Sequence, residues 1–184
     1  EMKRVLKNTG SIYLHCDSTA SHYLKIIMDT IFGEDNFRSE VIWHYVGGGW
    51  SKGYWSKKHD TILFYTKGKH WTFNVDDVRV PYDEKTIERS KTVLAGKIRP
   101  INPKGRLPDD VFEIPVLRQN SNERLGYPTQ KPLELLERII SASSNEISVN
   151  FRIISLSEIE NFLVLKKGFS DRNNRYSHST FTLL

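Results

Sequence analysis

The clearest fold signal in this chain is a short apolar segment followed at once by an amphipathic one. Residues 12–16 are apolar and predict a buried strand. Residues 20–32 repeat apolar side chains at helical spacing, with Ser18 or Thr19 as a candidate N-cap and Gly33 as a C-terminal cap. The expected apolar face of this helix consists of Ala20, Tyr23, Leu24, Ile27, Met28, Ile31 and Phe32.

The following segments continue the alternation of strands and helices. Residues 41–45 and 61–66 predict two strands. Residues 71–75 predict a third, which forms a hairpin with the second through a turn at 67–69. A helix is expected over 84–94. Strands that alternate with helices predict an α/β layer fold.

Beyond residue 130 the chain contains one well-patterned helix and then changes in character. Pro132 suits the first turn of the helix, and Glu134 and Arg138 can pair on its surface. Its expected apolar face consists of Leu133, Leu136, Ile139 and Ile140. Residues 147–153 alternate as in a half-exposed strand, and a capping box at the start of 155–167 predicts a second helix there.

Composition and residue counts exclude several classes of protein. The formal net charge of +5 favours a polyanionic partner. No apolar run approaches the roughly 20 residues that cross a bilayer, so no membrane partner is expected. The single cysteine, Cys16, excludes internal disulfides and a cysteine-based zinc site, and it fits a reducing, cytoplasmic setting. No cluster of His, Cys and Asp has metal-ligand spacing, so no metal is expected.

The run Glu-Arg-Leu-Gly-Tyr-Pro-Thr-Gln-Lys-Pro at 123–132, followed at once by an apolar helix, is the strongest motif. Other blocks precede it in a fixed order. They are 10–17 (Gly-Ser-Ile-Tyr-Leu-His-Cys-Asp), 28–33 (Met-Asp-Thr-Ile-Phe-Gly), 36–43 (Asn-Phe-Arg-Ser-Glu-Val-Ile-Trp), 58–65 (Lys-His-Asp-Thr-Ile-Leu-Phe-Tyr) and 110–115 (Asp-Val-Phe-Glu-Ile-Pro). Together these blocks resemble the β-class S-adenosylmethionine-dependent DNA amino-methyltransferases, over residues 3 to about 145.

The resemblance implies a fold, a reaction and partners. The implied fold is an incomplete Rossmann-like methyltransferase fold, in which a twisted, mostly parallel sheet with flanking helices binds the cofactor at the carboxyl ends of its strands. The implied reaction transfers a methyl group from S-adenosylmethionine to an exocyclic amino group of adenine or cytosine. The implied partners are double-stranded DNA, from which the target base is flipped, and a cognate restriction endonuclease.

Two motifs of that class are missing from the sequence. The catalytic signature of the Asp-Pro-Pro-Tyr type is absent, since the chain contains no Pro-Pro pair. The glycine loop expected just after Asn145 is also absent, since 147–158 contains no glycine. With Glu1 at the start and a helix already under way at 2–7, these absences predict a piece of a longer protein that is inactive alone. A frameshift, a truncated reading frame or a gene fusion would each produce this sequence.

The resemblance also predicts how the chain is divided. Residues 1–75 are expected to form part of the catalytic domain, and 76–122 a target-recognition insertion. Residues 123–145 are expected to supply a cofactor-side helix, and 146–184 a divergent tail.

Cofactor-binding candidates lie where strands end or helices begin. Thr129, Gln130 and Lys131 precede a helix, whose free N–H groups can meet the amino acid end of S-adenosylmethionine. The alternative is that Thr129 is an ordinary N-cap and Lys131 a solvated charge. Asp17 ends a buried strand and is either a cofactor-binding candidate or a turn residue before the next helix. His15 is expected to have a structural role, with its side chain hydrogen-bonded.

DNA-binding candidates occupy a glycine-rich loop and the insertion. The loop joins cations to large aromatic side chains, a combination that suits phosphate contact and base stacking. Its candidates are Trp50, Lys52, Tyr54, Trp55, Lys57, Lys58 and His59, and those of the insertion are Arg89, Lys91 and Arg99. The alternatives are a surface loop whose tryptophans fold back on the core and a solvated charged face.

Two other functions fit the same residues. One is a non-catalytic DNA-binding protein on a degenerate methyltransferase scaffold, whose tail completes the fold without cofactor. The other is an RNA-directed methyltransferase, since a basic aromatic loop does not separate DNA from RNA.

Overall fold

A computed structural model describes residues 2–47, 49–92, 100–126 and 130–145, together with the backbone of two later strands. The strands are β1 (Ser11–Asp17), β2 (Phe37–His44), β3 (His59–Thr66), β4 (Val111–Glu113), β5 (Phe151–Ser155) and β6 (Leu163–Leu165). The helices are α1 (Met2–Val5), α2 (Ser21–Phe32), α3 (Glu84–Lys91) and α4 (Leu133–Ser143), with short 3₁₀ turns η1 (Glu34–Asn36) and η2 (Val75–Val78). No helix among the described residues is long and apolar enough to cross a membrane.

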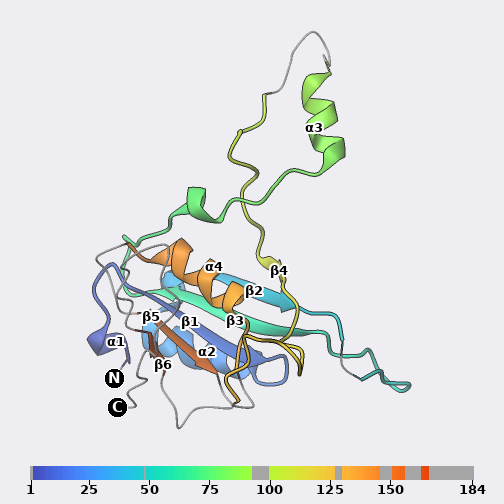
Figure 1. The fold of residues 1–184 in the computed structure, drawn as a ribbon. Helices are drawn as coiled ribbons and strands as arrows, with labels where there is room; N and C mark the ends of the chain where they lie inside the picture. Colours follow the sequence, from blue (N-terminus) through green and yellow to red (C-terminus); the bar gives the residue numbers. More distant parts are fainter. Residues whose placement is uncertain are drawn as a thin grey trace.

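The six strands form one mixed sheet in the order β4-β2-β3-β1-β5-β6 (Figure 1). β1, β2, β4 and β5 run in one direction, and β3 and β6 run in the other. The α/β class is confirmed, but only the β4–β2 and β1–β5 pairs are parallel. The direct connection from β2 to β3 explains the difference, because neighbouring strands joined without a crossover element pair antiparallel.

Helices cover both faces of the sheet (Figure 1). α4 packs on the face that carries Tyr13, Val41, Trp43, Ile62 and Phe64, to which it contributes Leu135 and Ile139. α2 packs on the other face, against Leu6, Ile12, Leu14, Leu63 and Tyr65, to which it contributes Met28 and Phe32. Residues that alternate along each strand therefore fill two separate cores.

The predicted helix at 20–32 is confirmed, but its cap and its buried face differ from expectation. Neither Ser18 nor Thr19 caps it. Instead the Asp17 carboxylate at the end of β1 accepts hydrogen bonds from the backbone N–H groups of Thr19 and Ala20, both at 2.9 Å. Met28 is buried as expected, but Tyr23, Ile27 and Ile31 of the same predicted face are exposed. The helix is apolar on two sides, so spacing alone does not identify the side that faces the sheet.

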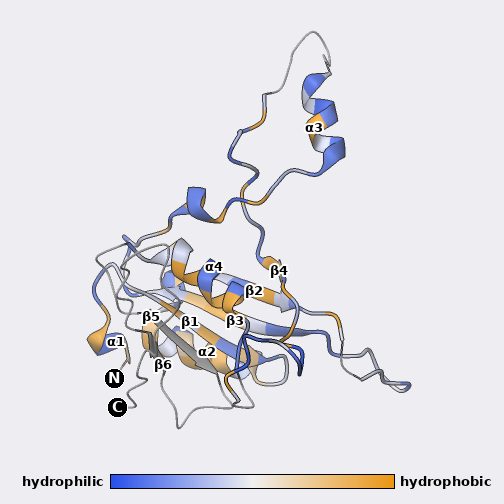
Figure 2. Cartoon of the chain, in the orientation of Figure 1, coloured by the Kyte–Doolittle hydropathy of each residue, from blue (hydrophilic) through white to orange (hydrophobic). Residues whose placement is uncertain are grey.

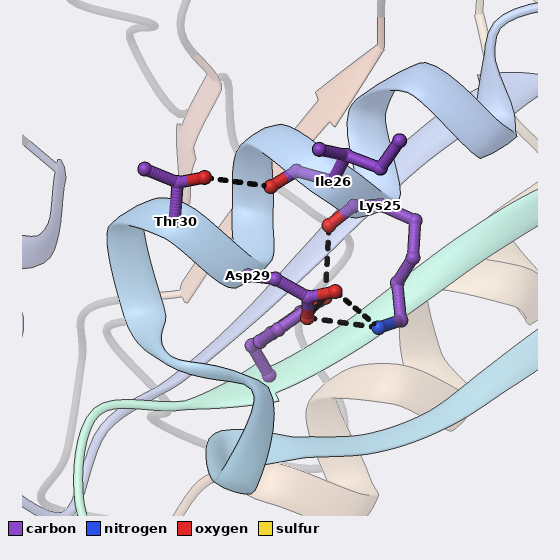
Figure 3. Close-up of polar contacts among 5 residues, drawn as sticks. Lys25, Ile26, Asp29 and Thr30 are labelled. Carbon is purple, nitrogen blue, oxygen red and sulfur yellow. Dashed lines mark hydrogen bonds and ion pairs between the residues drawn. The ribbon is translucent and has the colours of Figure 1, made fainter.

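A polar network on α2, in which Figure 3 shows the Lys25–Asp29 contacts, connects this helix to Tyr65 of β3. The Lys25 Nζ donates to both carboxylate oxygens of Asp29, at 2.7 and 2.8 Å, and the Tyr65 hydroxyl donates to the same carboxylate at 2.6 Å. The Lys25 ammonium also lies 4.2 Å from the centre of the Phe37 ring. The hydrogen bonds from Lys25 and Tyr65 lower the pKa of Asp29.

The strand predicted at 71–75 is wrong, and with it the hairpin turn at 67–69. This segment crosses the end of α4 instead of returning along β3. The Asn74 side chain donates to the backbone oxygens of Ser141 and Ser144 at 3.0 and 2.8 Å, and its backbone N–H donates to Ala142 at 2.6 Å. Asn74 thus satisfies carbonyl groups that a helix C-terminus leaves without partners.

The helix after Pro132 is confirmed as α4, with its surface pair of Glu134 and Arg138 at 3.7 Å. Its buried positions are Leu135, Ile139 and Ala142, whereas Leu136 and Ile140 are partly buried at the edge of the core. The helix predicted over 155–167 is wrong at Ser155, which ends β5, and at Leu163–Leu165, which form β6. The rest of that prediction lies outside the described residues.

The segment between η2 and β4 stands away from the sheet (Figure 1). Its helix α3 confirms the prediction at 84–94 as far as Lys91, and residues 93–94 lie outside the described part of the chain. The Asp83 side chain caps the helix by accepting from the Thr86 backbone N–H at 2.8 Å. α3 is mostly hydrophilic (Figure 2). β4 and the buried Ile114 fall inside the predicted insertion at 76–122 but belong to the sheet and its core.

Candidate functional site

Polar residues gather at one edge of the sheet, where the parallel strands end. Asp17 ends β1, His44 ends β2, and β3 begins there. The strand register places Asp60 opposite both Asp17 of β1 and Trp43 of β2. Ligand sites in α/β sheets form outside the carboxyl ends of parallel strands, so this edge is the candidate site.

The Asp60 carboxylate is the centre of the polar contacts at this edge. One oxygen lies 2.9 Å from the Nε2 of His15, and the other accepts a hydrogen bond from the Tyr45 hydroxyl at 3.3 Å. The His15 ring is buried, and its centre lies 5.8 Å from that of Trp43. Trp43, which lies opposite Asp60 in the strand register, belongs to the core on the α4 side, so the Asp60 carboxylate lies at the rim of that core.

Charges around Asp60 shift the pKa values of its neighbours. Burial raises the pKa of Asp60, but hydrogen bonds from His15 and Tyr45 and the positive charge of Lys131 outweigh burial, so its pKa is lowered. Burial and the Asp60 charge raise the pKa of Tyr45. Burial and nearby carboxylates raise the pKa of Cys16 to about 12. The thiol is therefore neutral and unreactive near neutral pH.

The segment before α4 brings the second group of cofactor candidates to this edge. The Gln130 side chain donates to the Glu123 carbonyl and accepts from the Leu125 backbone N–H, both at 2.7 Å. The Glu123 carboxylate accepts from the backbone N–H of Leu133, the first residue of α4. Gln130 therefore orders the segment that carries Lys131. Thr129 lies outside the described residues.

The loop at 45–58 leaves the sheet at the same edge (Figure 1). The Lys58 ammonium donates to the carbonyl groups of Gly47 and Gly49 and lies 4.5 Å from the centre of the Trp50 ring. The Lys57 ammonium donates to the Thr19 hydroxyl at 2.8 Å, which ties the loop to the end of β1. The loop is thus anchored beside Asp17.

Three large aromatic side chains of this loop point into solvent. Trp55 is 96% exposed, Trp50 85% and Tyr54 72%. Lys52 is also exposed, whereas His59 pairs with His44 in the sheet and is half-buried. The tryptophans do not fold back on the core, which removes the alternative reading of this loop.

The structure does not bring the candidates of the insertion to this edge. Arg89 and Lys91 are exposed on α3, which stands apart from the loop and the sheet (Figure 1). Arg99 lies outside the described residues. The two arms of the insertion are joined by a backbone bridge between Val80 and Arg106 and by a hydrogen bond of 2.9 Å from Arg79 to the Gly105 carbonyl.

Sequence reasoning did not single out Asp60 and Tyr45 as site residues. They lie on either side of the loop, and only the pairing of β2 with β3 places them together. Two signals were available. Tyr45 continues the alternation of Val41 and Trp43 onto the same face, and Asp60 directly precedes the predicted strand at 61–66. Among the described residues, no group of three or more His, Cys, Asp or Glu side chains could hold a metal ion.

Comparison with known proteins identifies the family. The family model described as DNA methylase, for the N6 and N4 enzymes, matches residues 1–151. The Type II methyltransferase M.HpaI of Haemophilus parainfluenzae is 38% identical over 79% of this chain and 43% of its own length. The DNA adenine methyltransferase YhdJ of Escherichia coli K12 is 30% identical over 79% of this chain and 49% of its own length.

Two further matches complete the comparison. The Type II methyltransferase M1.MboII of Moraxella bovis is 37% identical over 59% of this chain and 46% of its own length. A solved structure, described as the crystal structure of an M1.HpyAVI–SAM complex, aligns with a TM-score of 0.45 and 19% identity over 81% of this chain and 57% of that chain. The chain spans about half the length of the curated relatives it matches. It belongs to the N6/N4 family of DNA methylases.

Proposed function

We propose that this chain is part of a site-specific DNA methyltransferase that transfers a methyl group from S-adenosylmethionine to an exocyclic amino group of adenine or cytosine. One observation carries the proposal. The edge that gathers Asp17, Asp60 and the segment of Lys131 is also the edge from which the exposed aromatic loop at 45–58 leaves the sheet. A cofactor site and a nucleic-acid surface would then adjoin, as a transfer between the two substrates requires.

The residues at the edge fit the amino acid end of S-adenosylmethionine. That end carries a carboxylate and an ammonium group. Lys131, two residues before the first turn of α4, offers a cation near a helix N-terminus, where anions are favoured. Asp17 is exposed and offers a carboxylate to the ammonium group. When bound, S-adenosylmethionine supplies a methyl group on a sulfonium; the amino nitrogen that accepts the methyl loses a proton.

The loop fits single bases and phosphates. Trp50, Tyr54 and Trp55 present ring faces to solvent, and stacking on such rings stabilises unpaired bases without reading their sequence. Lys52 and Lys57 add positive charge on the same loop. A base flipped from a duplex needs such a surface once it has left the stack. Arg89 and Lys91 on α3, and Arg99, would contact DNA away from the flipped base.

The role in a restriction–modification system rests on the relatives. M.HpaI and M1.MboII are both named Type II methyltransferases. We infer that the chain belongs to the modification enzyme of such a system, with a cognate endonuclease that cleaves the unmodified sequence.

The test is binding of both substrates to the purified chain. Isothermal titration calorimetry measures the affinity for S-adenosylhomocysteine, the cofactor analogue. Fluorescence anisotropy measures the affinity for a labelled DNA duplex of mixed sequence. The proposal expects both ligands to bind, and Lys131→Ala to weaken only the cofactor analogue. Lys69→Ala, at the opposite edge of the sheet, is the matched control. Absence of duplex binding at low salt, or a cofactor affinity unchanged by Lys131→Ala, would contradict it.

A second candidate, a non-catalytic DNA-binding protein on the same scaffold, is favoured by a different observation. β5 and β6 lie at or beyond residue 151, where the family match ends, yet β5 pairs in parallel with β1 and β6 extends the sheet. The tail would then complete the sheet without cofactor. Thermal unfolding separates the candidates, because a ligand that binds only the folded state raises the melting temperature. A cooperative transition indifferent to S-adenosylmethionine would favour the second candidate.

A further inference from the structure

Asp60 connects three segments that are distant in the sequence. Its side chain is 21% exposed, and each carboxylate oxygen has its own partner. His15 of β1 holds one oxygen at 2.9 Å, and Tyr45, which follows β2, holds the other at 3.3 Å. The carboxylate is therefore fixed from the sheet on one side and bonded to the loop base on the other.

His15 is held as a donor to Asp60. Its side chain is only 6% exposed, and the other ring nitrogen, Nδ1, has no hydrogen-bond partner in the part of the chain that the structure describes. A carboxylate only accepts hydrogen bonds, so the Nε2 of His15 carries the hydrogen between them. The lack of a partner at Nδ1 leaves the bond to Asp60 as the single polar contact that orients this buried ring among the described residues.

Tyr45, the first residue of the loop at 45–58, closes the base of this loop. Its backbone N–H donates to the Lys58 carbonyl at 3.0 Å, which joins the two ends of the loop. Its ring centre lies 5.3 Å from that of Trp43, in the core on the α4 side. The hydroxyl bond to Asp60 adds a third contact to Tyr45 at the base of the loop.

Asp60 itself is poorly placed to bind a nucleic acid. Its negative charge repels phosphates, and its two oxygens already accept from His15 and Tyr45. The aromatic side chains that point into solvent lie further along the loop, beyond Tyr45. Any favourable effect of Asp60 on the binding of a polyanion must therefore act through the loop.

We propose that Asp60, oriented by His15, is a positioning residue that fixes Tyr45 and thereby holds the loop at 45–58 in the orientation that binds nucleic acid. This inference rests on the proposed function, which supplies the ligand. It assigns to the pair of His15 and Asp60 a role on the DNA side of the site, without contact with DNA.

The experiment measures binding of a fluorescein-labelled duplex to the full chain by anisotropy, over a series of salt concentrations. Tyr45→Phe removes only the hydroxyl and changes no charge. His15→Leu removes the donor to Asp60, and His15→Gln keeps an N–H donor of similar reach. Asp35→Asn, on η1 at the other end of β2, is the matched control. Melting temperatures are measured in parallel.

Loss of one hydrogen bond is expected to weaken duplex binding about three- to tenfold in Tyr45→Phe and in His15→Leu. His15→Gln should restore most of the affinity. The double variant His15→Leu with Tyr45→Phe should bind no worse than whichever single variant binds less tightly, since both substitutions act through the position of Tyr45. The slope of affinity against salt should stay unchanged, because no phosphate contact is lost.

Three outcomes would overturn the inference. They are wild-type affinity in Tyr45→Phe, failure of His15→Gln to restore binding in a folded protein, and independent, multiplicative losses in the double variant. If His15→Leu does not fold, Tyr45→Phe decides alone. If the wild-type chain binds no duplex, the proposed function fails instead, and this result is distinct from equal binding by wild type and variants.

Discussion

The Nε2 of His15 lies 2.9 Å from a carboxylate oxygen of Asp60, across the antiparallel pair of β1 and β3. This contact joins the end of a buried strand to the base of the exposed loop. It lies beside Lys131, whose charge lowers the pKa of Asp60. The Asp60 carboxylate thus interacts both with the segment before α4, through the charge of Lys131, and with the loop at 45–58, through the Tyr45 hydroxyl.

Trp55 is expected to carry much of the affinity for flipped or single-stranded bases. It is 96% exposed on a cationic loop, and stacking of a base on an aromatic ring contributes about 1–3 kcal/mol. Trp55→Ala should therefore weaken binding of single-stranded DNA by about tenfold or more. Tyr23→Ala, which removes an exposed aromatic ring from α2, is the control. Equal binding by the two variants in an anisotropy assay would rule out stacking on Trp55.

Gly105 is expected to be essential for the neck of the insertion, the paired backbone segments at 79–82 and 104–106. Its φ is +107°, and a Cβ there would lie 2.5 Å from the Val80 carbonyl oxygen, which accepts the backbone bond from Arg106. Gly105→Ala should destabilise the neck by about 1–3 kcal/mol. Hydrogen exchange should then rise at 79–82 and 104–106 but stay unchanged in β1 and β3. Gly53→Ala, where a Cβ meets nothing within 4 Å, should leave exchange as in wild type.

Asn74 is expected to stabilise α4 more than its loop position suggests. Its side chain satisfies two carbonyl groups at the end of the helix. Asn74→Ala would leave them without partners and lower the free energy of unfolding by about 1–3 kcal/mol. Chemical denaturation measures the loss, with Asn122→Ala at an exposed position as control. A midpoint equal to that of the control would show that Asn74 is dispensable.

Asp29 is expected to make stability depend on pH in the acid range. Lys25 and Tyr65 lower its pKa in the folded chain, so its ionised form stabilises the fold. That contribution is complete above the ordinary carboxyl pKa of 3.8 and is lost as pH falls through the lower folded value. Wild type should exceed Asp29→Asn in melting temperature at neutral pH, and the gap should close below about pH 4. A gap that stays constant down to that range would show that charge is not the cause.

Local sequence patterns predict where helices and strands lie better than they predict which residues these elements contact. Helical spacing located α2, but it could not show that Met28 and Phe32 face the sheet while Tyr23 and Ile27 face solvent, because both sides of the helix are apolar. Residues 71–75 have the composition of a strand, yet β3 is already paired with β2 on one side and β1 on the other, and Asn74 bonds to the end of α4 instead. In both cases a contact distant in the sequence decides the outcome.

The candidate site divides in the same way. Asp17 and Lys131 could be nominated from a strand end and a helix start, and the structure places both around Asp60. Gln130 is also predicted as a ligand, and the structure adds that its side-chain amide oxygen and nitrogen bond to the backbone at 125 and 123. Asp60 and Tyr45 could not be linked from sequence alone, because the register of β2 with β3 brings them together.

The most direct test of the central claim is a titration of the isotopically labelled chain with S-adenosylhomocysteine, followed by amide chemical shifts. The account predicts shifts at 15–17, at 44–60 and at 130–133, with none in α3, and their loss in Lys131→Ala but not in Lys69→Ala. Shifts confined to other parts of the chain, or a spectrum unchanged at saturating ligand, would contradict a cofactor site at the carboxyl edge of the sheet.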